Sequence, residues 1–205
     1  MKIQYKKVMT RQIYRAFGAF CIMMDCLILK MLFRIYGVHH SSFRSVGLPH
    51  LTVRKGASVT IGKGFRLNNR FYGNALSVQR CAIWVGEGAG LTIRDNVGIS
   101  SSFIVAADSI TIEDNVKIGG GCYIMDTDFH SLDPMQRQSP DTDRSGAGTA
   151  PIIIRENAFI GAASIILKGT VIGRNSVIGA GSVVTGNVPD GQLWAGNPAR
   201  FIRQL

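Results

Sequence analysis

One short stretch of the sequence, "DTDFHSLD", places an imidazole among several carboxylates. His130 lies two residues after Asp128 and three before Asp133. Imidazole is neutral near pH 7 and still accepts a proton, which suits it to general-base chemistry. A carboxylate beside it could hold the second ring nitrogen and set the tautomer. Two interpretations of His130 stay open from the residues alone: a base oriented by Asp128 or Asp133, and a solvated loop histidine with no chemical task, which is the usual one for a lone histidine.

The elements that would position His130 follow a six-residue period. A step of six turns an α-helix of 3.6 residues per turn by about 240° and would scatter the repeated side chains around it. Short strands that end at glycine-containing corners fit the period instead, and hexapeptide periodicity is typical of a parallel β-helix. The aliphatic residues in this series are Ile154, Ile160, Ile166, Ile172, Ile178 and Val184.

The same period recurs upstream from Ile61, with irregular stretches near residues 70–84 and 106–110. It stops again at residues 126–151, where His130 lies. A polar loop of that length inside a compact domain is usually functional or disordered. We therefore expect an all-β solenoid over residues 46–205, with a protruding loop at 126–151, a C-terminal tail at 187–205 and a helical arm at 1–45.

The repeat and the tail "VPDGQLWAGNPARFIRQL" together resemble the left-handed β-helix, hexapeptide-repeat acyltransferases, and in particular the sugar O-acetyltransferases. The resemblance covers the chain from about Val53 to its last residue. It implies a left-handed coil of three hexads per turn, a homotrimer, and acetyl-CoA as the acyl donor. It also implies that His130 deprotonates the acceptor hydroxyl.

The resemblance further implies that the donor lies in a groove between adjacent subunits. Backbone groups at corners made of glycine and another small residue would contact its pantetheine arm, and basic side chains near the tail its phosphates. Many members carry lysine after the threonine of "VVTG", where this chain has Gly186, so Lys168 is a substitute candidate. Trp194 either caps the last coil or stacks on a ligand. The positions carried over are Ala162, Ala180, Thr185, Lys168, Arg200, Arg203 and Trp194.

Cysteine and histidine usage bears on the compartment and on metals. The four cysteines show no CxxC spacing, which favours buried thiols in a reducing compartment. Cys122 occupies the small position of its hexad, so we expect it to point inward. Three of the four histidines precede the clear repeats, which disfavours the three-histidine zinc site of the β-helix carbonic anhydrases. We expect no metal.

The net charge of +10 is concentrated at the start of the chain. Residues 1–50 hold eight Lys and Arg against the single acid Asp25. A basic segment can suit nucleic acid or anionic lipid. This segment is apolar rather than polar and carries no recognised nucleic-acid motif, so we do not expect nucleic acid as a partner.

The arm at residues 1–45 has the pattern of a basic amphipathic helix. Asp25 and Lys30 would each cost about 2.5–3.5 kcal/mol at a bilayer centre, whereas each apolar residue returns only about 0.3–0.6 kcal/mol, which disfavours a span. Two interpretations remain open: the helix packs on the solenoid or a neighbouring subunit, or residues 1–40 lie on an anionic membrane face. Its apolar stripe comprises Ile13, Phe17, Phe20, Met24, Ile28, Met31 and Ile35.

These observations together favour an acetyl-CoA-dependent O-acetyltransferase that acts on a sugar or surface-polysaccharide precursor. His130 would take the hydroxyl proton while a backbone N–H stabilises the oxyanion. We expect a cytoplasmic protein, either free or at the inner face of the membrane. An antibiotic O-acetyltransferase would share the fold and the histidine, and a non-catalytic membrane-docking scaffold would share the fold alone.

Overall fold

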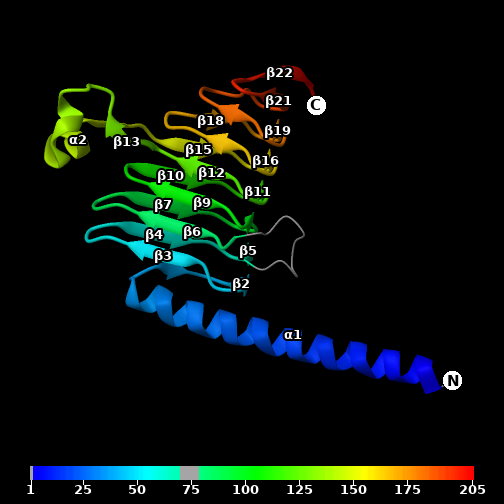
Figure 1. Cartoon of the computed structure of the whole chain (residues 1–205). Helices are drawn as coiled ribbons and strands as arrows, with labels where there is room; N and C mark the ends of the chain where they lie inside the picture. Colours follow the sequence, from blue (N-terminus) through cyan, green and yellow to red (C-terminus); the bar gives the residue numbers. More distant parts are fainter. Residues whose placement is uncertain (1, 70–78) are drawn as a thin grey trace.

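The computed structural model describes residues 2–69 and 79–205, and side chains from residue 12 onward with the exception of residue 13. A long helix, α1 (Lys2–Ile35), leads into a stack of short strands that ends at the opposite end of the molecule in the C-terminus (Figure 1). The part of the earlier irregular stretch at residues 70–78 lies outside the described residues.

The strands form three parallel sheets that the chain visits in rotation. The first face contains β1 (His39–His40), β4 (Ser58–Ile61), β7 (Gly90–Ile93), β10 (Ser109–Ile112), β15 (Ile152–Ile154) and β18 (Val171–Ile172). The second contains β2 (Phe43–Val46), β5 (Phe65–Asn68), β8 (Gly98–Ser100), β11 (Lys117–Ile118), β16 (Phe159–Ile160) and β19 (Val177–Ile178), followed by β21 (Gln192–Gly196) and β22 (Ala199–Gln204). The third contains β3 (His50–Val53), β6 (Ala82–Val85), β9 (Phe103–Ala106), β12 (Tyr123–Met125), β17 (Ile165–Ile166) and β20 (Val183–Val184). Each coil, meaning one passage through the three faces, adds a strand to each sheet, as expected for a parallel β-helix.

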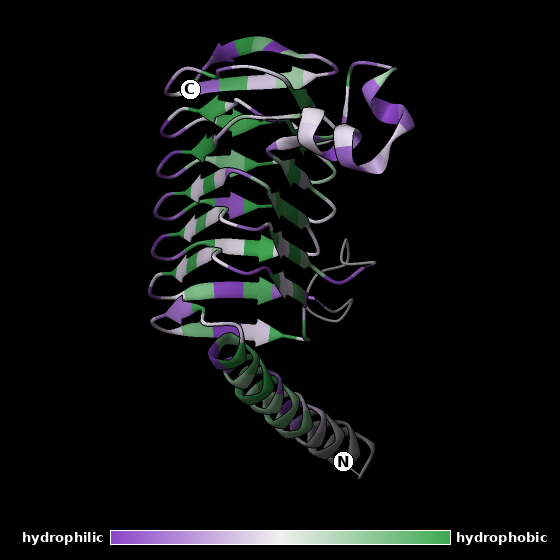
Figure 2. Cartoon of the chain, turned by 90° about the vertical axis from the view of Figure 1, so that its left-hand side faces the viewer, coloured by the Kyte–Doolittle hydropathy of each residue, from purple (hydrophilic) through white to green (hydrophobic). Residues whose placement is uncertain are grey.

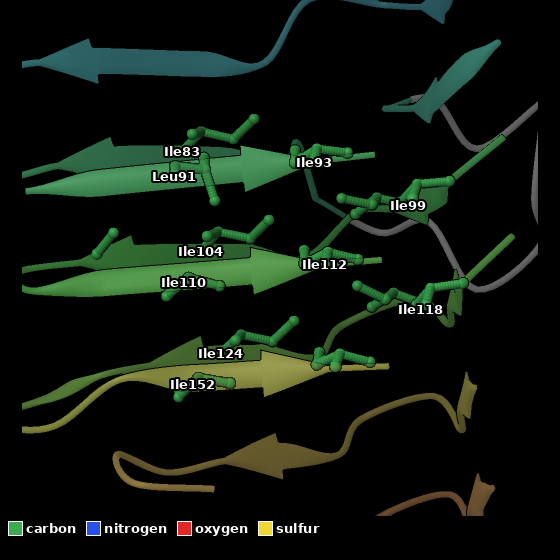
Figure 3. Close-up of a cluster of buried hydrophobic side chains, with 14 of the residues drawn as sticks. Ile83, Leu91, Ile93, Ile99, Ile104, Ile110, Ile112, Ile118, Ile124 and Ile152 are labelled. Atoms are coloured by element: carbon green, nitrogen blue, oxygen red, sulfur yellow. The ribbon is translucent and has the colours of Figure 1, made fainter. Parts of the chain in front are cut away.

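The six-residue period is the length of one side of a coil. Ile154 pairs with Ile172, and Ile160 with Ile178, so that three steps of six return the chain to the same place one coil on. The branched side chains of all three faces point into one shared core, where the labelled isoleucines form continuous ladders (Figure 3). Full burial of such a side chain contributes about 1.5–3 kcal/mol.

Insertions at corners break the period without breaking the pairing. Ile93 pairs with Ile112, 19 residues on, and Ile112 pairs with Ile154, 42 residues on. The coil also begins earlier than the expected boundary at residue 46, because β1 already pairs with β4 through His39 and Thr60. The extra residues lie between strands, so the inward aliphatic positions keep their register.

An asparagine ladder builds the corner between the first and second faces. Its members adopt left-handed backbone conformations, with φ of 57–61° at Asn96, Asn115, Asn157 and Asn175. The Asn157 amide donates a hydrogen bond to the side-chain oxygen of Asn175 at 3.0 Å. Gly64 takes this place in an earlier coil, where a Cβ would lie 2.7 Å from the side-chain oxygen of Asn96. Asparagine tolerates this conformation better than most residues, so these corners do not need glycine.

The helix α1 closes the open lower end of the core. Leu29 and Phe33 are buried, and the Phe33 ring meets Phe43 edge-on at a centroid distance of 5.1 Å. The backbone N–H of Gly47 donates to an Asp25 carboxylate oxygen at 2.8 Å, and Asp25 is only 5% exposed. The packing face of α1 is therefore the one that carries Asp25, which is not the apolar stripe identified in the sequence.

The asparagine ladder yields a stability prediction. We expect Asn175→Ala to lower the melting temperature by about 2–6 °C, because alanine in the left-handed region costs about 1–2 kcal/mol. Asn175→Gly should stay within about 2 °C of the parent, because glycine adopts this φ freely. Thermal unfolding followed by circular dichroism measures both. An equal loss in both variants would mean that the side-chain hydrogen bond, and not the backbone conformation, matters.

Candidate functional site

The loop that carries His130 leaves the coil at the corner between the third and first faces. It contains β13 (Thr127–Ser131), η2 (Gln136–Gln138), α2 (Pro140–Gly146) and β14 (Ala147–Thr149), and it projects to one side of the stack (Figures 1 and 2). Asp126 anchors its root, since its two buried carboxylate oxygens accept from the N–H groups of Ala107 and Asp108 at 2.6 and 3.0 Å. Burial raises the pKa of Asp126, although these hydrogen bonds oppose the shift. A buried root of this kind holds a projecting loop in one place.

The imidazole of His130 is held by a carboxylate from the far side of the loop. His130 Nδ1 lies 2.6 Å from Asp143 Oδ2, and the backbone N–H of Ser131 donates to Asp143 Oδ1 at 2.8 Å. The His130 side chain is 70% exposed, whereas that of Asp143 is 16% exposed. The hydrogen bond from His130 is the largest cause that lowers the pKa of Asp143. With Nδ1 engaged, Nε2 is the ring atom left to take a proton.

Neither of the two aspartates proposed from the sequence orients His130. Asp128 Oδ2 instead lies 3.3 Å from the ammonium of Lys168, and Asp133 accepts from the N–H of Met135 at 2.8 Å. The backbone explains why: Phe129, between Asp128 and His130, has φ of 63°. A bulky residue in the left-handed region turns the chain sharply, so neighbours in sequence diverge.

Asp143 was missed because it lies 13 residues from His130 in the sequence. The signal that would have located it is the start of α2, "SPDTD", with Pro140 in its first turn and acids at Asp141 and Asp143. Proline at the first helical position followed by acids is typical of a helix start. That short helix folds back along β13 and returns Asp143 to the imidazole.

Two of the residues carried over for the donor lie at the corner between the second and third faces. Ala162 and Ala180 stack there in successive coils, and the N–H of Gly181 donates to the Ala162 carbonyl at 2.8 Å. A Cβ on Gly161 would lie 2.5 Å from the Ala180 nitrogen, so the corner leaves no room for a side chain at that position. On the hairpin above, Ala195 pairs with Arg200.

Other carried-over residues lie at a different corner or within the hairpin. Thr185 and Lys168 lie at the corner from which the loop projects. Lys168 is six residues beyond Ala162, and six extended residues would span at most roughly 20 Å. Within one chain, Ala162 and the His130 loop thus flank opposite edges of the third face. Trp194 is half-buried against the core and its indole N–H donates to Gln192 at 2.8 Å, which is a packing position.

The outer surface of the third face between these edges is apolar. The Phe103 and Tyr123 rings stack with centroids 4.8 Å apart and planes 10° from parallel. The strand register continues their column through Ile165 and Val183. Ordinary solvated faces seldom carry such a column, so this surface is a candidate for contact with another molecule.

Cys81 and Cys122 are the buried free cysteines among the described residues. Cys122 is fully buried, as expected, and its Sγ lies 3.1 Å from the Gly161 carbonyl oxygen. Burial raises the pKa of Cys81 to about 11 and also raises that of Cys122, so neither is a ready nucleophile. Among the residues that the structure describes, no group of three or more His, Cys, Asp or Glu side chains could hold a metal ion.

Comparison with known proteins identifies the repeat. Residues 151–186 match a family model described as the hexapeptide repeat of succinyl-transferase. A Mycobacterium tuberculosis protein assigned as an acetyltransferase is 30% identical over 165 residues, which cover 76% of this chain and 52% of that protein. An Escherichia coli K12 protein assigned as a lipopolysaccharide-biosynthesis O-acetyltransferase, WbbJ, is 31% identical over 54% of this chain and 58% of its own length. The chain thus spans just over half the length of these relatives.

Solved structures share the fold. A variant of AntD, an N-acyltransferase from Bacillus cereus crystallised with dTDP and coenzyme A, superposes with a TM-score of 0.65 at 21% identity, over 85% of this chain and 88% of that one. At this identity the likeness concerns the fold. The matched repeat and the two relatives confirm the resemblance to hexapeptide-repeat acetyltransferases.

The His130–Asp143 pair yields a titration prediction. Asp143 should titrate below its ordinary value of 3.8, and His130→Ala should raise its pKa because the largest stabilising contact is lost. The stability that the pair contributes is therefore present above about pH 4 and is lost as pH falls through the lowered pKa. Carboxyl-carbon NMR measures the shift, and His39→Ala, at the other end of the molecule, is the control. An unchanged Asp143 titration in His130→Ala would contradict the contact.

Proposed function

We propose that this chain, whose residues 151–186 carry the hexapeptide repeat, is an acetyl-CoA-dependent O-acetyltransferase acting on a hydroxyl of a sugar or surface-polysaccharide precursor. The observation that carries the proposal is the exposed imidazole of His130 held through Nδ1 by Asp143. The relative assigned to lipopolysaccharide biosynthesis supports a glycan acceptor, and the coenzyme A bound to AntD supports the donor. The free cysteines are consistent with a cytoplasmic location.

His130 acts as the general base in this proposal. Its Nε2 takes the proton of the acceptor hydroxyl as that oxygen attacks the thioester carbonyl of the donor. Asp143 accepts a hydrogen bond from Nδ1–H, which keeps Nε2 unprotonated beforehand and stabilises the imidazolium that forms. When the tetrahedral intermediate collapses, the C–S bond breaks and His130 returns the proton to the departing CoA thiolate. A backbone N–H stabilises the intermediate oxyanion, and no acyl-enzyme is required.

The donor side of the proposal uses the stacked corner at Ala162 and Ala180. A side chain is excluded at Gly161, and only methyl groups stand at Ala162 and Ala180, so that a pantetheine arm could lie close to the backbone of this corner. Arg200 and Arg203 are exposed on β22 and can meet the phosphates. Lys168 is engaged by Asp128, so we assign it to positioning the loop and not to the phosphates.

The separation of the two groups favours a site shared between subunits. The donor corner and the His130 loop flank opposite edges of the third face in one chain. We propose that three left-handed coils associate side by side, so that the loop of one chain faces the donor corner of the next. The apolar column at Phe103 and Tyr123 would then lie against a neighbour or the donor.

The proposed base is tested with a panel of sugars, nucleotide sugars, lipid-linked glycans and hydroxylated antibiotics, scored by thiol release from acetyl-CoA. We expect His130→Ala to lower kcat about 10²–10⁴-fold on any acceptor that turns over. Asp143→Asn should lower kcat by roughly 10–10³-fold with little change in KM, because the wrong tautomer is then favoured. Asp141→Asn, on the same helix, should stay near the parent. Full activity in His130→Ala would reject the base, and turnover of antibiotics alone would reject the glycan acceptor.

The donor assignment is tested by binding. We expect Arg200→Ala and Arg203→Ala each to weaken acetyl-CoA affinity about 10-fold or more, because each removes a charged hydrogen-bonding partner of the phosphates. The KM for the acceptor should not change. Calorimetric titration with CoA reports the affinity, and Arg174→Ala, an exposed arginine at another corner, is the matched control. CoA affinities equal to the parent's would remove the tail from the donor site, and absence of any CoA binding would favour a scaffold.

A further inference from the structure

The helix α1 carries an apolar stripe that faces away from the coil. Its inward side is formed by Asp25, Leu29 and Phe33, which are buried. The outward side chains are three or four residues apart, which aligns them along the helix. They are large and solvent-exposed, Leu27 to 60% and Ile35 to 69%. This outward stripe differs from the stripe identified in the sequence, because Ile28 is half-buried and Leu27 is exposed. It comprises Phe17, Phe20, Met24, Leu27, Met31 and Ile35.

Asp25, whose charge disfavours an apolar environment for this helix, does not lie on the stripe. Asp25 lies on the packing side, where it accepts the hydrogen bond from Gly47. Lys30 and Arg34 are exposed and flank the stripe. By length and composition alone, Tyr14–Ile35 would be long and apolar enough to cross a membrane. From Asp25 to Phe33 its inward side is committed to the coil, so along this part only the outward side is available to a partner.

The coil adds a strong positive charge at the same end. Residues 36–100, which follow α1, hold eight Lys and Arg against two acids, whereas residues 101–205 hold eight against ten. Because each coil stacks on the one before, order in the sequence becomes position along the axis, and α1 lies at the base of the stack (Figure 2). In the first two coils Arg44, Arg54, Lys55, Lys63 and Arg66 are all exposed. The excess of basic residues therefore lies at the α1 end.

We propose that the α1 end of the coil docks on an anionic phospholipid bilayer. The stripe enters the boundary between headgroups and acyl chains, and the basic residues of α1 and the first two coils meet the lipid phosphates. A second copy of the chain is the other candidate for covering the stripe. Pairing two copies there would bring two strongly basic ends together, whereas an anionic surface complements them. The dock is peripheral, because Asp25, Leu29 and Phe33 hold the helix against the coil.

Flotation of the whole chain with vesicles tests the proposal. We expect it to float with phosphatidylcholine vesicles containing 30% phosphatidylglycerol and to bind pure phosphatidylcholine at least 10-fold more weakly. Each basic residue near such a surface adds about fivefold to the partition coefficient. Raising NaCl from 0.1 to 0.5 M should release most of the protein, because the charges are then screened.

Variants separate the two contributions. Phe20→Ser with Leu27→Ser changes only exposed side chains and should lower partitioning at least 10-fold with no loss of thermal stability. Arg44→Glu with Arg66→Glu, on the coil itself, should lower it by 25-fold or more. Arg144→Glu with Arg174→Glu makes the same net-charge change at the other end and should lower it less than threefold.

Several results would overturn the dock. Absence of flotation with anionic vesicles, or unchanged flotation of the serine variant, would remove the stripe from lipid binding. If the Arg144→Glu and Arg174→Glu variant lost as much vesicle binding as the Arg44→Glu and Arg66→Glu variant, net charge and not its location would govern binding. Retention after an alkaline carbonate wash would indicate a span. A serine variant with a smaller oligomer mass by light scattering and unchanged flotation would assign the stripe to a second copy.

Discussion

The vertical stacking of inward aliphatic side chains is the interaction on which the rest of this structure depends. Every coil places a branched residue directly above its counterpart in the coil before, as Ile154 and Ile172 do. The parallel hydrogen bonds between coils can form only while this register holds. Variation is therefore confined to the corners, where insertions of different length leave the ladders intact. The coil is a rigid scaffold because its core is continuous.

The position of the candidate site follows from the confinement of sequence variation to the corners. One corner carries the loop that presents His130, and the buried carboxylate of Asp126 fastens its root to the preceding coil. At a second corner, close stacking excludes a side chain at Gly161, and only methyl groups stand at Ala162 and Ala180. A rigid coil thus presents the proposed base and the proposed donor surface on two edges of one face. Placement of chemistry on loops held by a rigid scaffold is a general solution in proteins.

A linear stack also converts sequence order into distance along an axis. The two ends of the coil cannot be equivalent, because each must close an open core in its own way. At one end α1 does so with Leu29 and Phe33, and at the other an antiparallel hairpin of β21 and β22 does so. Since the basic residues precede the acidic ones in the chain, the molecule has a basic end and a weakly acidic end.

The sequence alone determined the six-residue period, the interrupting loop, the inward position of Cys122 and the prominence of His130, because each depends on residues close together in the chain. Left-handed asparagine corners were also present in the sequence but were not recognised as a signal. Only the tertiary structure decided that Asp143 holds the imidazole, because α2 and the turn at Phe129 bring together residues 13 positions apart. It also decided which side of α1 is buried. Periodicity shows that a helix has two unlike sides, but the choice between them depends on what lies at the end of the coil. There the N–H of Gly47 donates to Asp25, and the ring of Phe43 packs against Phe33, so that this side of the helix is buried.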